Sequence, residues 1–114
     1  MKIQEFLDKT HPTEKELRPR IICNDGFSMS VQAGEETHSM PSETEKIRFS
    51  SVEIGYPNEE EELLFGLAEN EENYTDTIYP YIPVELVNEI INKHGGIDVN
   101  ETFKDRFKRR TKNG

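Results

Sequence analysis

The sequence RIICNDGFSMSVQ, residues 20–32, predicts a β-hairpin, and the rest of the fold can be built outward from it. Its centre, Asn24-Asp25-Gly26, is a turn signal because an Asp-Gly pair readily adopts the positive φ angles of tight hairpins. Residues 20–24 predict the first strand. Apolar and polar residues alternate from Phe27 to Gln32, which predicts a half-buried second strand whose serines face water.

Two further segments extend the predicted sheet. Residues 47–56 predict a third strand, and its alternation slips by one position at Ser50-Ser51, which we interpret as a β-bulge. Residues 77–82 predict a fourth strand, and Pro80 places it at an edge because proline has no backbone N–H to donate. The bulge interpretation predicts that one side of the third strand buries all its apolar residues: Ile47, Phe49, Val52, Ile54 and Tyr56.

Helices are expected around residues 3–9, 59–68 and 84–94. Asn58 is the expected N-cap of the second helix, and Gly95-Gly96 is expected to end the third. The predicted fold is therefore α+β, a small antiparallel sheet of three or four strands with two or three short helices. We expect residues 1–97 to form a single compact domain and residues 98–114 a basic, flexible tail.

Composition narrows the function classes. The chain has 114 residues, 32% of them hydrophobic, so it has room for one domain with a small core. A formal net charge of -9 argues against a general nucleic-acid binder, and we expect no specific nucleic acid as a direct partner. Apolar runs are too short to span a bilayer, so no membrane is expected. The single cysteine and the acidic, amphipathic N-terminus favour a cytoplasmic location.

Charge is unevenly distributed along the chain. No Lys or Arg occurs between Arg48 and Lys93, whereas this stretch is rich in Glu. The C-terminal end is basic, and its cations are Lys104, Arg106, Lys108, Arg109, Arg110 and Lys112. This end could be exposed chain, contact RNA or an acidic surface, or pair with the acidic body of the same protein.

Catalytic templates are absent: the sequence contains no phosphate-binding GxxxxGK[ST], no HExxH and no G-x-S-x-G. We therefore expect no enzyme. Cys23 lies beside two isoleucines, and a buried structural thiol is the favoured interpretation. Cys23 and His38 are weak candidates for a zinc site, because they lack the tight spacing of metal ligands. No cofactor is otherwise expected.

The acidic stretch and its tyrosines are the candidate partner-binding residues. Carboxylates can occupy phosphate positions on a basic groove and accelerate association, and tyrosine is common at interface hot spots. A solvated surface for the acids and packing on the edge strand for the tyrosines are the alternatives. The candidates are Glu59, Glu60, Glu61, Glu62, Glu69, Glu71, Glu72, Asp76, Tyr79 and Tyr81.

Three stretches resemble small uncharacterised acidic proteins carried by prophages and mobile elements of gut and oral bacteria. They are PTEKELRPR (12–20), DGFSMSVQ (25–32) and YPYIPVELV (79–87). The resemblance covers most of residues 1–97, leaves out the basic end and transfers no functional residue. By analogy of size and charge, it implies an inhibitor of host defence of the anti-CRISPR type.

The leading functional hypothesis is a non-catalytic phage or mobile-element inhibitor that binds a basic nucleic-acid-binding defence protein of the host. A CRISPR effector such as Cas9, blocked from engaging nucleic acid, is the named example. The alternative is a structural or accessory phage protein that self-associates or binds another phage component. A small metal-binding protein is the third.

Overall fold

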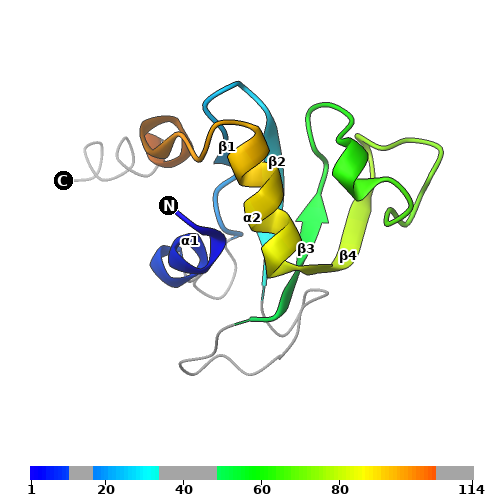
Figure 1. The fold of residues 1–114 in the computed structure, drawn as a ribbon, viewed down its shortest axis with the longest axis horizontal. Helices are drawn as coiled ribbons and strands as arrows, with labels where there is room; N and C mark the ends of the chain where they lie inside the picture. The colour runs from blue at the N-terminus through cyan, green and yellow to red at the C-terminus, as the bar shows by residue number, and fades with distance from the viewer. Residues whose placement is uncertain (11–16, 34–48, 105–114) are drawn as a thin grey trace.

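The computed structural model describes residues 1–10, 17–33 and 49–104, and in these ranges the chain forms an α+β fold (Figure 1). The sheet has four antiparallel strands in the order β1-β2-β3-β4. This confirms the predicted fold class. The elements in chain order are α1 (Ile3–Lys9), β1 (Ile21–Ile22), β2 (Ser28–Gln32), β3 (Ser51–Gly55), the 3-10 turn η1 (Glu62–Leu64), β4 (Ile78–Pro83) and α2 (Val84–Lys93).

The β1–β2 hairpin forms where the turn signal predicts it. The N–H of Cys23 donates to the carbonyl of Phe27 over 2.8 Å, and the N–H of Gly26 donates to the carbonyl of Cys23 over 3.0 Å. Gly26 has a φ of +96°, a conformation that costs a residue without a Cβ little. The turn of the hairpin therefore adopts the geometry that its local sequence predicts.

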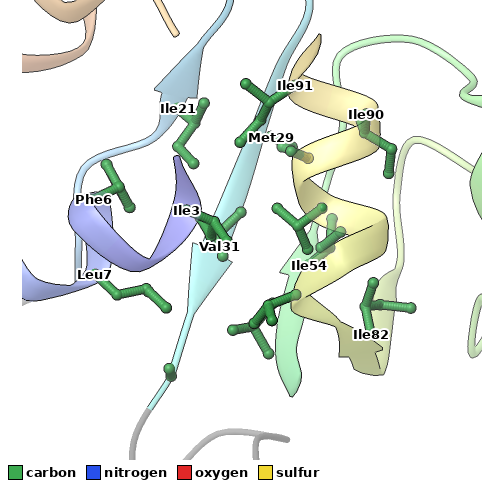
Figure 2. Packing of buried hydrophobic residues seen from close by; sticks show 14 of the residues in the cluster. Ile3, Phe6, Leu7, Ile21, Met29, Val31, Ile54, Ile82, Ile90 and Ile91 are labelled. Carbon is green, nitrogen blue, oxygen red and sulfur yellow. The ribbon is translucent and has the colours of Figure 1, made fainter. Parts of the chain in front are cut away.

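The core lies between the sheet and the two α-helices. Figure 2 shows α2 crossing the sheet, with α1 packed beside it and the apolar side chains of all layers meeting between them. The N–H of Ile3 donates to Asn88 Oδ1 over 2.9 Å and joins the start of α1 to α2. The labelled core residues are Ile3, Phe6, Leu7, Ile21, Met29, Val31, Ile54, Ile82, Ile90 and Ile91, all buried.

The other face of β2 is not the water-facing surface that the alternation predicts. Ser28 and Gln32 are buried, because two arginines lie against them. Arg20 Nε donates to Ser28 Oγ over 2.9 Å, and the N–H of Arg18 donates to Gln32 Oε1 over 3.0 Å. The expectation of exposed serines is wrong for Ser28, which the long side chain of Arg20 covers, whereas Ser30 is partly buried.

The predicted bulge at Ser50-Ser51 is wrong, because β3 begins only at Ser51. The irregularity lies farther along, between Val52, which pairs with Ile82, and Ile54, which pairs with Tyr79. Two β4 residues, at positions 80 and 81, thus oppose one residue of β3. Proline cannot donate to the ladder, which gives a physical reason for a slip at this point.

The burial predicted for the third strand holds only in part. Phe49, Val52 and Ile54 are buried, but Tyr56 is half exposed. Tyr56 follows the end of β3 and has a φ of +49°, outside the extended region, so its side chain leaves the buried face. Ile47 lies outside the described residues.

The helix expected over residues 59–68 is wrong, and the only regular element there is the short η1. Asn58 does not cap it. Its Oδ1 accepts from the N–H of Ser28 over 2.8 Å, and its Nδ2 donates to the carbonyl of Gly26 over 2.9 Å. Glu61 caps η1 instead, by accepting from the N–H of Leu63. A tertiary contact with the hairpin therefore overrides the local helix signal.

The chain after α2 packs on the domain beyond the expected boundary at residue 97. Ile97 bridges to Cys23, and residues 99–104 are helical. Thr102 Oγ1 accepts from the N–H of Ile22 over 3.0 Å, and the rings of Phe103 and Phe6 lie 6.1 Å apart. The first part of the segment expected to be a flexible tail thus covers the edge of β1. Residues 105–114 lie outside the described ranges.

Candidate functional site

A chain of four charged side chains joins three distant segments; two of them, His94 and Glu61, are buried, and the other two, Asp25 and Lys93, are exposed. His94, just after α2, lies between two carboxylates: its Nδ1 is 2.6 Å from Asp25 Oδ2 in the hairpin turn, and its Nε2 is 2.6 Å from Glu61 Oε1. The Phe27 ring stacks on the imidazole with centroids 4.1 Å apart and planes 12° apart. We call Asp25, His94, Glu61 and Lys93 the charge network.

Glu61 is the most deeply placed member of the charge network, with a side chain that is 0% exposed. Its second oxygen, Oε2, accepts from Lys93 Nζ over 2.8 Å and from the N–H of Leu63 over 2.9 Å. A buried carboxylate is tolerated only when it is paired and hydrogen-bonded, and here both oxygens have partners. Glu61 therefore ties the chain after β3 to the end of α2.

The directions of the pKa shifts favour the charged forms of Glu61, His94 and Asp25. Burial works against ionisation of both Glu61 and His94. For Glu61, the hydrogen bonds from Leu63, Lys93 and His94 outweigh burial and lower the pKa. For His94, the bonds to Glu61 and Asp25 outweigh it and raise the pKa. The pKa of Asp25 is lowered, first by the N–H of Phe27 and then by His94. An imidazolium thus lies between two carboxylates.

We predict that stability falls on both sides of a plateau. The raised His94 pKa contributes stability that is complete below the ordinary histidine pKa and is lost as pH rises through the folded-state value. The lowered pKa values of Asp25 and Glu61 contribute stability that is present above their ordinary values and is lost as pH falls through the folded-state values. Urea unfolding measured across pH tests both limbs.

A His94→Gln variant is the control for the alkaline limb. Without the imidazole, the decline in stability between neutral and mildly alkaline pH should disappear. An alkaline decline of the same size in this variant would show that another group causes it.

The charge network positions an acidic loop, residues 59–76, which leaves the sheet after β3 and returns at β4. Figure 1 shows it at the opposite end of the molecule from α1 and the helical residues after α2. Its exposed carboxylates belong to Glu59, Glu60, Glu62, Glu69, Glu71, Glu72 and Asp76. Glu62 lies 3.6 Å from Lys93, an exposed contact of small energetic weight.

Contacts within the acidic loop brace it. The Glu71 carboxylate accepts from the N–H of Gly66 over 3.1 Å, from the N–H of Ala68 over 2.7 Å and from the Tyr74 hydroxyl over 3.0 Å. The N–H of Glu69 donates to the carbonyl of Ile78 over 2.9 Å, which fastens the loop to β4. The loop therefore presents its carboxylates from a defined backbone.

The structure divides the candidate partner-binding residues into two groups. Glu61 and Tyr79 are buried in this structure: Glu61 belongs to the charge network and Tyr79 to the core. Tyr81 is 55% exposed and stands at the β4 bulge. The remaining acids lie on the surface of the acidic loop.

Two features of this site were missed by sequence reasoning. The first is the pairing of His94 with two carboxylates: Asp25 and Glu61 lie 69 and 33 residues away in sequence, and no spacing signal links them. Phe65 was not singled out, yet it is 46% exposed and stacks on Tyr74. An aromatic residue inside an acidic stretch was the available signal.

Of the two weak zinc candidates, only Cys23 lies within the described residues. Cys23 is buried, and its pKa is raised to about 11 by burial and by the charge of Asp25, so the thiol stays protonated. His38 lies outside the described ranges. Within those ranges, no group of three or more His, Cys, Asp or Glu side chains is arranged to hold a metal ion.

Comparison with protein families, with curated proteins and with solved structures found no match. Across the described ranges, no helix has both the length and the apolar character needed to cross a bilayer.

Proposed function

We propose that this chain is a non-catalytic acidic binding protein whose acidic loop docks on the basic, nucleic-acid-binding surface of another protein. One observation carries the proposal: exposed carboxylates are gathered on a single braced loop, in a stretch from residue 49 to 92 without Lys or Arg. The prophage resemblance makes the partner a host defence protein, with a CRISPR effector such as Cas9 as the example, in the host cytoplasm.

The physical argument is electrostatic complementarity. A partner groove that binds nucleic acid holds Lys and Arg at phosphate spacing, and carboxylates from the acidic loop can take those positions. Opposite fields accelerate encounter, and salt weakens them. The internal bonds of the loop reduce the conformational entropy that docking would otherwise remove.

The test is a salt series of binding to a purified Cas9–guide RNA complex, with and without competing target DNA. Glu59, Glu60 and Glu72 are exposed, and none of the bracing contacts involves their carboxylates. Replacing all three with Gln should weaken binding by about 10- to 100-fold at low salt, because about 1–3 kcal/mol of interface electrostatics is lost. The difference from wild type should shrink as salt rises.

A charge-matched control removes three acids from the opposite end of the molecule: Glu5→Gln, Asp8→Asn and Glu101→Gln. This variant should bind within about twofold of wild type. An equal loss in both variants would show that only net charge matters, which contradicts docking through the acidic loop. If wild type instead fails to bind the complex and shows, in light scattering, a mass that rises with protein concentration, that result would support the alternative of a self-associating accessory protein.

A further inference from the structure

An exposed aromatic stack lies inside the acidic loop. The rings of Phe65 and Tyr74 have centroids 4.6 Å apart and planes 22° apart, and Phe65 is 46% exposed. Leu67, two residues on, is also largely exposed. Aromatic side chains are enriched at the contact surfaces of proteins, so an exposed aromatic pair is a candidate contact surface.

Hydrogen bonds to Tyr74 hold the stack in place. The Tyr74 hydroxyl donates to Glu71 Oε1 over 3.0 Å, and the carbonyl of Tyr74 accepts from the hydroxyl of Tyr79 over 2.5 Å. Tyr79 itself is buried in the core on β4. Tyr79 therefore fixes the backbone of Tyr74 to the sheet and Glu71 holds its hydroxyl, so the ring that stacks on Phe65 is preorganised for a ligand.

The surroundings of the stack are negative. The pKa of Tyr74 is raised, first by its hydrogen bond to Glu71, then by burial and by the charges of Glu71 and Glu60. The Glu71 carboxylate contacts the Tyr74 hydroxyl directly. Lys93, the nearest cation in sequence after the loop, already pairs with Glu61. An aromatic face in a negative field attracts a cation that can also stack.

We propose that the Phe65–Tyr74 stack binds an arginine side chain of the basic partner, with the guanidinium plane lying on Phe65 and its N–H groups within reach of the surrounding carboxylates. This inference rests on the proposed function and names the side chain that the acidic loop recognises. Arginine fits better than lysine because its planar, weakly hydrated guanidinium stacks on aromatic rings and donates to carboxylates in a fixed fork.

The test uses three synthetic peptides that alternate glycine with arginine, lysine or citrulline. Aromatic and amide NMR shifts of the full chain report binding and its position. We expect the arginine peptide to bind at least fivefold more tightly than the lysine peptide and to shift the Phe65 and Tyr74 ring signals. The uncharged citrulline peptide should bind too weakly to measure.

The decisive variant is Phe65→Leu, which keeps an apolar side chain but removes the aromatic face. It should weaken arginine-peptide binding about tenfold and leave lysine-peptide binding within twofold. The matched control, Leu67→Ala, removes a neighbouring exposed apolar side chain and should leave both affinities within twofold. Circular dichroism and thermal unfolding check that each variant is folded.

Four outcomes overturn the inference. If Phe65→Leu binds the arginine peptide as well as wild type does, the stack does not select arginine. The same holds if wild type binds the arginine and lysine peptides equally. In either case, salt-dependent binding of both peptides would leave the proposed function intact. If neither peptide binds wild type at low salt, the inference and the proposed function fail together. If Phe65→Leu leaves peptide binding unchanged but alters how the mass of the protein in light scattering depends on its concentration, the stack contacts a second copy of the chain.

Discussion

The His94→Gln variant is expected to be less stable than wild type by about 3 kcal/mol, the order seen when one partner of a buried ion pair is removed. A glutamine amide can donate to one of the two carboxylates but carries no charge, so Lys93 is the only charged partner that Glu61 keeps. The stack with Phe27 is lost as well. Urea unfolding at pH 6, where His94 is protonated, measures the change.

A double-mutant cycle separates the charge network from simple loss of packing. Glu61→Gln keeps the size of the side chain and removes its charge, so it should also destabilise. If the imidazolium and the carboxylate stabilise each other, the two substitutions are not additive. The double variant should then lose at least 1 kcal/mol less stability than the two single variants lose together. Additivity within about 0.5 kcal/mol would contradict a coupled network.

The Tyr79→Ala variant is expected to lose about 3–5 kcal/mol, the usual cost of removing a buried aromatic side chain. Tyr79 is only 1% exposed, and its hydroxyl supports the acidic loop at Tyr74. Domains of this size have total stabilities at the lower end of about 5–15 kcal/mol, so the variant should be largely unfolded at 37 °C. Near-ultraviolet circular dichroism and urea unfolding test this.

Two control substitutions test whether the loss of stability comes from the burial of the Tyr79 ring. Tyr79→Phe keeps the ring and should lose only about 1 kcal/mol, the contribution of one hydrogen bond. Tyr81→Ala, at the exposed bulge, should cost less than Tyr79→Ala by at least 2 kcal/mol. If Tyr79→Ala remained as stable as Tyr81→Ala and only weakened partner binding, the original interpretation of Tyr79 as a contact residue would be correct.

Local sequence was sufficient for the hairpin, the edge position of β4 and the two α-helices. Each depends on residues next to one another: a turn with Gly26 at positive φ, a proline that removes a ladder donor, and an apolar stripe that ends at a glycine pair. Such signals act over one turn of chain and need no distant partner. The predicted helices at 3–9 and 84–94 match α1 and α2 within one residue.

The candidate site was predicted only in outline. Sequence located the acidic stretch, but tertiary structure decided which of its residues face solvent. Asn58 reaches 30 residues back to Ser28 instead of capping a helix, and Glu61 reaches 33 residues forward to His94 instead of facing a partner. A carboxylate looks the same in sequence whether it is solvated or buried against an imidazolium. Only the fold brings the second charge to it, and burial then makes that pairing obligatory.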